Sequence, residues 1–274
     1  MQDPWAGRRV AVTGCSSGIG ESVAQRLLRR GADVVGLDIR EPATGVGRYV
    51  PLDLADPESV TAAARAVGAV DALINVAGVS GAMQPPRIID INFVGTRELT
   101  EAIIPAMGRG AAVVSTASLA ASRYAERRHL IAGLLSTTTR EQAAEWSERH
   151  RDEVGTGYAI SKDALVWYTL HRSLELAARG IRMNAVAPGI TDTPILDATR
   201  AARGERFLET IPIPLGRIAS PDEQAAVLVF LASPEASYVT GQIIWSDGGL
   251  SAGVATGAID QVTGSVGEAP PRGS

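Results

Sequence analysis

The sequence contains very few cysteine, histidine and aromatic residues. Of its 274 residues, one is cysteine and three are histidine, and aromatic residues make up 4%. The single cysteine, Cys15, excludes an internal disulfide framework and fits a reducing cytoplasm. His129, His150 and His171 lie far apart, without the spacing of metal ligands, so we expect no metal site.

A large net charge and a long apolar run are also missing. The formal charge is −4, so there is no overall positive field to attract nucleic acid or an anionic membrane. No apolar run approaches the ~20 residues that a membrane-spanning helix needs. The first residues do not form a basic and then apolar signal segment. We therefore expect a cytoplasmic protein that binds neither nucleic acid nor membrane.

Short β-branched runs alternate with helix-length segments along most of the chain. This alternation is typical of βαβ units in a parallel sheet. No linker divides the series, so residues 1–250 are expected to form one domain. Residues 251–274 are rich in Gly, Ala, Val and Pro without periodicity, which predicts an extended or partly disordered tail. The expected strands are 9–13, 33–38, 48–53, 72–76, 111–116, 181–187 and 242–246.

Three glycines follow the first expected strand, at Gly14, Gly18 and Gly20. Glycines let a backbone approach phosphate closely, and the N-terminus of the following helix offers free N–H groups. A glycine-rich turn alone is weak evidence, but its place in the first βα unit favours a dinucleotide site. The spacing is G-x-x-x-G-x-G, which differs from the commoner G-x-G-x-x-G.

The second expected strand ends at Asp38. A carboxylate at this position can accept hydrogen bonds from the adenosine ribose of NAD and would repel the 2′-phosphate of NADP. A turn-forming aspartate is the alternative interpretation. Arg40, two residues later, is evidence against the NAD assignment, because a guanidinium can bind a phosphate.

Tyr158 and Lys162 stand at i and i+4 of an expected helix, so their side chains share one face. A phenol has a pKa near 10 and is a poor base at neutral pH. A neighbouring ammonium group stabilises the phenolate and lowers this pKa. The same pattern is frequent by chance, so its weight depends on the motifs around it.

Further motifs occur in a consistent order. They are Asp53-Leu54, Asn75-Val76-Ala77-Gly78, Asp90-Ile91-Asn92, Ser118, Pro188-Gly189 and Asp247-Gly248-Gly249. With the glycine loop and the Tyr–Lys pair, they make roughly residues 8–250 resemble a short-chain dehydrogenase/reductase. The resemblance implies an α/β Rossmann-type fold, with a doubly wound, seven-stranded parallel sheet in the strand order 3-2-1-4-5-6-7.

The resemblance also implies hydride transfer between NAD(H) and a secondary alcohol or ketone. Tyr158 would exchange a proton with the substrate oxygen, and Lys162 would lower the pKa of Tyr158 and bind the nicotinamide ribose. Ser118 would hydrogen-bond the substrate oxygen, and Asn92 would support a proton relay to Lys162. A non-catalytic NAD(H)-binding sensor or scaffold is the alternative. An enoyl reductase is disfavoured, since it implies a wider Tyr–Lys spacing and no matching serine.

A larger set of residues is implied for the cofactor. Asp53 and Leu54 would lie near the adenine, Asn75 would fix the central strands, and Thr193 would hydrogen-bond the carboxamide. The full expected set is Gly14, Ser17, Gly18, Ile19, Gly20, Asp38, Ile39, Asp53, Leu54, Asn75, Ala77, Gly78, Tyr158, Lys162, Pro188, Gly189, Thr191 and Thr193.

Two features depart from the family pattern. Val76 replaces the second asparagine of the usual N-N-A-G. Ser118 lies much further before Tyr158 than is usual, and Ser115 is a rival for the role of the serine. The intervening residues, 119–157, form an insertion in which we expect two short helices. This insertion resembles that of bacterial 3α-hydroxysteroid dehydrogenase/carbonyl reductases, although it could equally be a lid or an interface element unrelated to steroid specificity.

The insertion and the region after Pro188 bear on partners. We expect a homo-oligomer. In related enzymes the helix that begins at Tyr158 and the one around Asn92 commonly form an interface between subunits, and the insertion would either cover or extend this interface. The many charged residues of the insertion favour covering, and hence a dimer over a tetramer. The segment 188–217 suggests a hydrophobic substrate, such as a steroid, terpenoid or aryl ketone, although ordinary loop packing explains its composition nearly as well. Its apolar residues are Ile190, Ile195, Leu196, Phe207, Leu208, Ile211 and Ile213.

Overall fold

Seven parallel strands form the centre of the molecule. The computed structural model describes residues 3–80, 83–204 and 210–260. The strand order is β3-β2-β1-β4-β5-β6-β7, which confirms the predicted doubly wound sheet. The third strand ends at Pro51, two residues earlier than predicted. The strands are β1 (Arg9–Thr13), β2 (Asp33–Asp38), β3 (Arg48–Pro51), β4 (Ala72–Asn75), β5 (Ala112–Thr116), β6 (Arg182–Pro188) and β7 (Ile243–Ser246).

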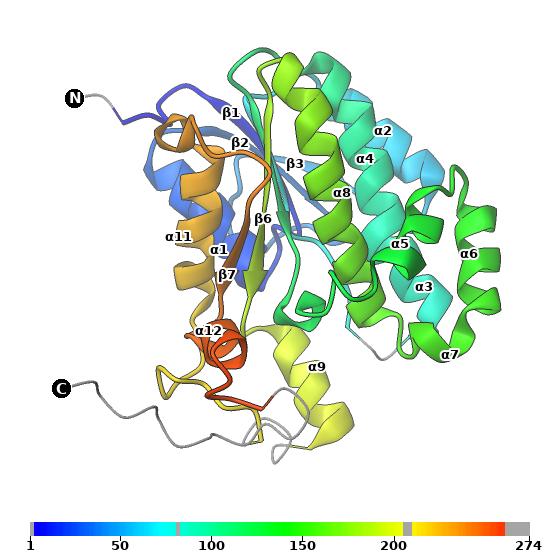
Figure 1. Ribbon diagram of the computed structural model, residues 1–274. Coiled ribbons are helices and arrows are strands. Elements are labelled where there is room, and N and C mark those ends of the chain that lie inside the picture. The colour runs from blue at the N-terminus through cyan, green and yellow to red at the C-terminus, as the bar shows by residue number, and fades with distance from the viewer. Residues whose placement is uncertain (1–2, 81–82, 205–209, 261–274) are drawn as a thin grey trace.

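Helices cover both faces of the sheet (Figure 1). One face carries α1 (Gly18–Arg29) and α11 (Pro221–Ala232), and the other carries α2 (Pro57–Val67), α4 (Thr96–Ile103) and α8 (Tyr158–Ala178). Successive strand side chains point to opposite faces. Accordingly, Val10 and Val12 pack with α1, whereas Ala11 between them packs in the cluster on the α2 side. Because both faces are covered, the strands are almost continuously apolar.

Helix starts follow the capping residues in the sequence. The Asp56 carboxylate accepts a hydrogen bond from the Glu58 N–H at 2.9 Å and begins α2. At α11, the segment Ser220-Pro221-Asp222-Glu223 has the sequence pattern of a capping box, and Ser220 and Glu223 form it, with Pro221 in the first turn. These caps satisfy N–H groups that a helix leaves unpaired at its N-terminus.

The long helical segment before β5 is not regular. It consists of α3 (Pro85–Ile89), a π-helical turn, η1 (Asp90–Gly95), then α4, and a final 3₁₀ turn, η2 (Ile104–Ala106). The sequence predicts one helix over about 88–107, which matches the extent but not the π-helical turn. Such turns interrupt helices rarely and often lie at functional sites. Asn92 lies inside this one.

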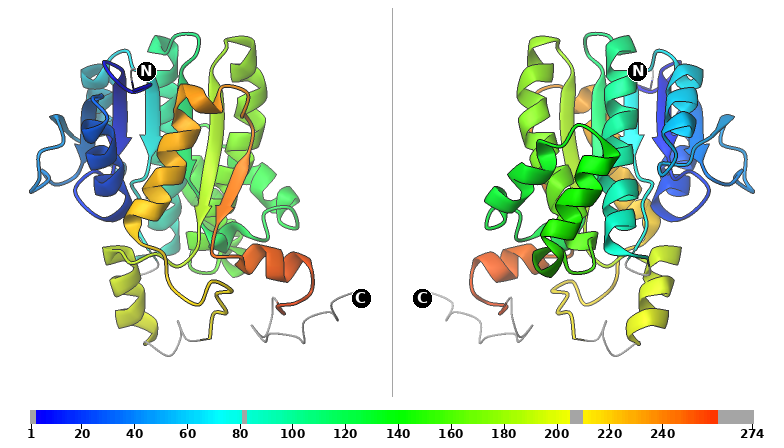
Figure 2. Two further views of the ribbon diagram at one scale, coloured as in Figure 1. Left: turned by 90° about the vertical axis from the view of Figure 1, so that its left-hand side faces the viewer. Right: turned by 90° about the vertical axis from the view of Figure 1, so that its right-hand side faces the viewer.

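The insertion packs against the domain that carries it. It contains a 3₁₀ turn, η3 (Leu119–Ala121), and the helices α5 (Arg128–Leu135), α6 (Arg140–Arg149) and α7 (Arg151–Val154). The two predicted short helices are therefore present, and α7 adds a third. The helices lie over α4 and α8 (Figure 2, right). Ile131, Leu134 and Trp146 are buried in the same cluster as Phe93 and Tyr168.

Two helices lie beyond the carboxyl ends of the strands, α9 (Pro194–Arg203) and α12 (Leu250–Ala255) (Figure 1). The prediction of an extended tail from residue 251 is wrong for its first part, because α12 is helical and Ile259 is buried. Ile259 packs closely against the Cα of Gly253, a contact that composition does not reveal. Residues 261–274 lie outside the described residues. Within the described ranges, no helix has the length and apolarity that crossing a membrane requires.

Candidate active site

A deep cavity opens at the carboxyl ends of the strands. Its volume is about 980 Å³. Parallel α/β sheets bind ligands at this edge, where the strand order reverses. All residues predicted for the cofactor and for catalysis line the cavity except Asn75 and Asn92. The structure thus brings together side chains from the loops after β1, β2, β3, β4, β5 and β6.

The glycine loop after β1 is folded too tightly for larger residues. Gly14 has a positive φ of 72°, and a Cβ there would lie 2.9 Å from the Ala77 backbone nitrogen. A Cβ at Gly20 would lie 2.1 Å from the Gly14 carbonyl oxygen. The loop is also tied to the one after β4, because the Thr13 hydroxyl accepts hydrogen bonds from the Val76 and Ala77 N–H groups. Sequence reasoning missed this role of Thr13.

Asp38 lies at one end of the cavity. Its carboxylate accepts hydrogen bonds from the Ser16 N–H at 3.0 Å and from the Arg40 N–H at 3.1 Å. These two backbone groups hold the carboxylate at the cavity wall. Arg40, an exposed residue, also lines the cavity. This end of the cavity therefore carries both the negative charge that would favour NAD and the positive charge that could bind the phosphate of NADP.

Asp53 and Leu54 form a wall of the cavity beside Asp38. Asp53 accepts a hydrogen bond from the Ala55 N–H at 2.8 Å, and its own N–H donates to the Ser59 hydroxyl at 2.9 Å. Leu54 is buried and lines the cavity. The loop is therefore held by local hydrogen bonds on one side, and its apolar side chain faces the space where a planar group could lie.

Tyr158 and Lys162 lie in the first turns of α8, on the face toward the cavity. The Lys162 Nζ is 5.8 Å from the centre of the Tyr158 ring and donates a hydrogen bond to the Thr116 carbonyl oxygen at 2.9 Å. Burial lowers the pKa of the Lys162 ammonium to about 8. Burial raises the pKa of Tyr158, and a side-chain hydrogen bond with Ser118 lowers it. The pair therefore lies in a site where desolvation strongly affects both groups.

The structure separates the two candidate serines. Ser118 lines the cavity, and its hydroxyl accepts a hydrogen bond from the Ala120 N–H at 3.1 Å at the start of η3. Ser115 lies within β5, where it is fully buried and accepts a hydrogen bond from the Asn75 side chain at 3.3 Å. Of the two, Ser118 is the serine beside Tyr158.

The two predicted asparagines lie behind the cavity wall. Asn75 donates hydrogen bonds to the Thr100 and Ser115 hydroxyls and so links β4 with α4 and β5. Asn92 accepts from the Val79 N–H at 2.8 Å and donates to the Val79 carbonyl at 3.0 Å.

Gly78 separates Asn92 from the lysine of the site. A Cβ on Gly78 would lie 3.0 Å from the Asn92 Oδ1 and 3.6 Å from the Lys162 Nζ. The missing side chain keeps a narrow polar space between these two atoms. A small polar molecule placed there could hydrogen-bond to both groups.

The rest of the cavity is mainly apolar. Four of the predicted apolar residues line it, namely Ile190, Ile195, Leu196 and Ile211. Ile213 instead contacts the Gly248 backbone, and Phe207 and Leu208 lie outside the described residues. Sequence reasoning missed further lining residues, including Met83, Arg87, Leu119 and Thr156. Among the residues that the structure describes, no group of acidic, histidine and cysteine side chains could hold a metal ion.

Comparisons with known proteins agree with this geometry. A family model described as short chain dehydrogenase matches residues 8–129, and one described as enoyl-(acyl carrier protein) reductase matches residues 149–251. The chain is 31% identical to coniferyl-alcohol dehydrogenase of a Pseudomonas species, across 89% of this chain and 96% of the relative. It is 33% identical to 3-alpha-hydroxysteroid dehydrogenase/carbonyl reductase of Comamonas testosteroni, with the same coverage.

A solved structure is similar over nearly the whole fold. The 3-alpha-hydroxysteroid dehydrogenase of Pseudomonas sp. B-0831, in complex with NADH, superposes with a TM-score of 0.78 at 29% identity. The match covers 90% of this chain and 98% of that one. The fold of this chain therefore has a counterpart in a known dehydrogenase.

Proposed function

The chain belongs to the short-chain dehydrogenase/reductase family, and from this membership we propose that it interconverts a secondary alcohol and a ketone with NAD(H). One observation carries the proposal: Ser118, Tyr158 and Lys162 meet in a single cavity that also contains the glycine loop and Asp38. A sensor that only binds the cofactor would not need the first three.

The described residues fit a dinucleotide. A side chain at Gly14 or Gly20 would collide with the backbone, so the loop offers the bare surface that a pyrophosphate requires. Residues Gly18–Gly20 begin α1, where the first N–H groups lack partners within the helix and the helix dipole favours an anion. The bound nicotinamide ring would supply the hydride chemistry.

The protein groups control the proton and the position of the substrate. We assign the Ser118 hydroxyl to hold the substrate oxygen, the Tyr158 hydroxyl to give that oxygen a proton during reduction, and the Tyr158 phenolate to take the proton of the alcohol during oxidation. The Lys162 ammonium stabilises the phenolate by its charge, and the Thr116 carbonyl fixes its position. Asn92 holds the neighbouring Val79 backbone and lines the polar space that leads to Lys162.

We propose NAD rather than NADP as the preferred cofactor. The Asp38 carboxylate is held in place by two backbone N–H groups, and it can accept hydrogen bonds from ribose hydroxyls. A 2′-phosphate near this carboxylate would be repelled. Arg40 could offset that repulsion, so the comparison of the two cofactors must include an Arg40→Ala variant.

We propose a hydrophobic alcohol or ketone as the substrate, such as a steroid, terpenoid or aryl ketone. The support is the apolar wall formed by Ile190, Ile195, Leu196 and Ile211, together with the exposed Met83 at its edge. The names of the relatives, which include a hydroxysteroid and a coniferyl-alcohol dehydrogenase, point to the same substrate class. We also propose a cytoplasmic location, because the single cysteine, Cys15, fits a reducing compartment.

Turnover of a substrate panel tests the proposal directly. The purified chain is incubated with NAD⁺ and aliphatic, aryl and steroid alcohols, or with NADH and the matching ketones and an enoyl thioester, while nicotinamide absorbance is followed. We expect oxidation of alcohols and reduction of ketones, fastest with bulky apolar members. Reduction of the enoyl thioester alone would instead favour the activity named by the second family model. Cofactor binding without any turnover would favour the sensor alternative.

We further propose that the protein is a dimer. The insertion buries Leu134 and Trp146 against its own chain, and its helix α5 covers part of the outer surface of α8. The face near β7 stays open and presents Phe230, which is 46% exposed, and the fully exposed Tyr238. Light scattering gives the mass, and substituting Asp for Tyr238 and Phe230 is expected to shift a dimer toward monomer.

A further inference from the structure

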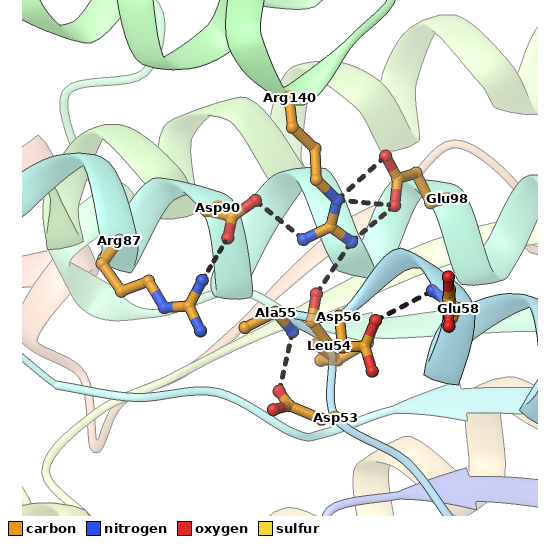
Figure 3. Close-up of polar contacts among 9 residues, drawn as sticks. All are labelled: Asp53, Leu54, Ala55, Asp56, Glu58, Arg87, Asp90, Glu98 and Arg140. Atoms are coloured by element: carbon orange, nitrogen blue, oxygen red, sulfur yellow. Dashed lines mark hydrogen bonds and ion pairs between the residues drawn. The ribbon is translucent and has the colours of Figure 1, made fainter.

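Arg140 joins the insertion to the wall of the cavity. It is the first residue of α6, and its side chain is only 13% exposed. Figure 3 shows its guanidinium between three other segments. Nη1 donates to the Asp90 carboxylate at 2.8 Å, Nε donates to the Glu98 carboxylate at 3.0 Å, and Nη2 donates to the Leu54 carbonyl oxygen at 2.9 Å.

The contact with Leu54 is the one that reaches the cavity. Leu54 and its neighbour Asp53 both line it. The Leu54 carbonyl lies against the π-helical turn, since a Cβ on Gly95 would be 2.1 Å from this oxygen. Gly95 therefore leaves room for the Leu54 peptide, and Arg140 donates a hydrogen bond to it. A buried carbonyl that lost this donor would favour another position of the loop.

The other two contacts hold the guanidinium in place. Asp90 is the first residue of the turn that carries Asn92, and it also accepts a hydrogen bond from Arg87 at 3.1 Å. Glu98 lies on α4. A planar guanidinium can donate to two carboxylates and a carbonyl in fixed directions, which a lysine ammonium cannot do with the same geometry.

We infer that Arg140 is a positioning residue for the adenine end of the cofactor, acting through the Leu54 carbonyl. This inference rests on the proposed function, in which the cavity binds NAD(H). It assigns the insertion a role at the loop after β3, which carries Asp53 and Leu54, rather than at the apolar substrate wall of the same cavity. The insertion would then raise cofactor affinity by holding the Asp53–Leu54 wall in one conformation.

Other contacts attach the insertion independently of Arg140. Arg127 pairs with the buried Asp163 on α8, and Arg97 donates to the Leu135 carbonyl at 3.3 Å. Ile131 and Trp146 are buried in the core. Replacing Arg140 therefore leaves the insertion in place, while the Leu54 carbonyl loses a defined partner. The effect should fall on binding of the adenine half of the cofactor more than on the fold.

The test uses Arg140→Lys, which keeps a cation between Asp90 and Glu98 and so protects the fold. Arg149→Lys is the matched control, because Arg149 lies on the same helix and, among residues 3–80, 83–204 and 210–260, its side chain hydrogen-bonds only to the Glu145 carbonyl within that helix. Isothermal titration calorimetry of each full chain with AMP, nicotinamide mononucleotide and NADH separates the two halves of the cofactor. Steady-state kinetics then gives KM for NAD⁺ and kcat.

We expect Arg140→Lys to weaken AMP and NADH binding about 5- to 10-fold, which is the effect of one ordinary hydrogen bond of about 1–1.4 kcal/mol, because the guanidinium acts on the cofactor only through the Leu54 carbonyl. Nicotinamide mononucleotide affinity and kcat at saturating NAD⁺ should stay within twofold of the wild type, and KM for NAD⁺ should rise with the AMP dissociation constant. Unchanged AMP affinity in Arg140→Lys, or equal weakening by Arg149→Lys, would overturn the inference. If the wild type binds neither AMP nor NADH, the proposed function itself fails.

Discussion

The ion pair between Arg127 and Asp163 allows a quantitative prediction. Asp163 follows Lys162 on α8, and its side chain is completely buried. One carboxylate oxygen accepts a hydrogen bond from Arg127 of the insertion at 2.7 Å, while the other has no partner among the described residues. Burial raises the pKa of Asp163 from its usual 3.8 to about 6, although the pairing with Arg127 opposes this rise.

The raised pKa makes stability depend on pH in a definite direction. The folded state binds the Asp163 proton more tightly than the unfolded state does. Protonation of Asp163 therefore makes its full contribution to the free energy of unfolding below about pH 3.8, and this contribution is lost as the pH rises through about 6. One pKa unit corresponds to about 1.4 kcal/mol, so the full loss is about 3 kcal/mol, of which about 2 kcal/mol falls between pH 4 and pH 7.

Asp163→Asn removes this titration and should be compared with the wild type by urea unfolding at pH 4, 5, 6 and 7. At any one pH, the difference in unfolding free energy between the two proteins includes the lost hydrogen bond with Arg127. That loss does not change with pH in the way that the titration of Asp163 does. We expect the stability of Asp163→Asn relative to the wild type to rise by about 2 kcal/mol from pH 4 to pH 7.

The control for this experiment is Asp152→Asn in α7, an exposed residue of the same insertion. This substitution removes one carboxylate from the protein surface without removing a buried one. A difference between Asp163→Asn and the wild type that stays constant from pH 4 to pH 7 would refute the argument. It would mean that Arg127 compensates fully for the burial of Asp163.

The remaining predictions concern the site. Tyr158→Phe should lower kcat by ~10²-fold or more, as for loss of a general acid–base group, with NADH affinity unchanged by calorimetry; the exposed Tyr238→Phe is its control, and near-normal turnover of Tyr158→Phe would exclude the mechanism. Ser118→Ala should lower kcat by ~10²-fold. Ser115→Ala should lower the free energy of unfolding by about 1 kcal/mol and retain kcat. The opposite result for the two variants would mean that Ser115, and not Ser118, holds the substrate oxygen. Asp38→Asn should lower kcat/KM for NAD⁺ about 10-fold and raise that for NADP⁺, and a wild type that prefers NADP⁺ even with Arg40→Ala would contradict the role of Asp38.

The fold could be predicted largely because its signals are local. Alternation of apolar residues gives the strands, and the Ser220–Glu223 capping box gives the start of α11 within the sequence itself. The π-helical turn over Asp90–Gly95 could not be predicted in the same way. It accommodates the close approach of the Leu54 carbonyl to Gly95, and that contact joins segments far apart in the chain. For the same reason, the packing of Ile259 on Gly253, which accompanies α12, was missed.

In the candidate site, too, the side chains could be predicted from the sequence and the backbone contacts could not. Side chains that the motifs name, such as Tyr158 and Ser118, are found in the cavity. Backbone acceptors are not visible in a sequence, because every residue has a carbonyl group. The Thr116 carbonyl that holds Lys162 therefore needed the structure. The sequence already favours Ser118 over Ser115, because Ser118 follows the expected fifth strand, and the structure places Ser115 inside β5, where it is fully buried.

The arginines of the insertion fall into two groups that the sequence does not separate. A segment rich in arginine and glutamate suggests a solvated surface, and Arg151, for example, is 77% exposed. Arg140, by contrast, is 13% exposed and bonds to the body of the domain. A sequence does not distinguish these two uses of arginine.

The inward arginines and the apolar residues together decide how the insertion can behave. Fully burying a large apolar side chain contributes roughly 1.5–3 kcal/mol, and Ile131, Leu134 and Trp146 are all buried within one chain. A tetramer that used the surface beneath the insertion would have to displace these side chains and break the Arg140 and Arg127 contacts. A tetramer built on the outer face of the insertion would keep them, but that face is rich in charged residues, which are depleted at interface cores. We therefore propose the covering arrangement and, with it, the dimer.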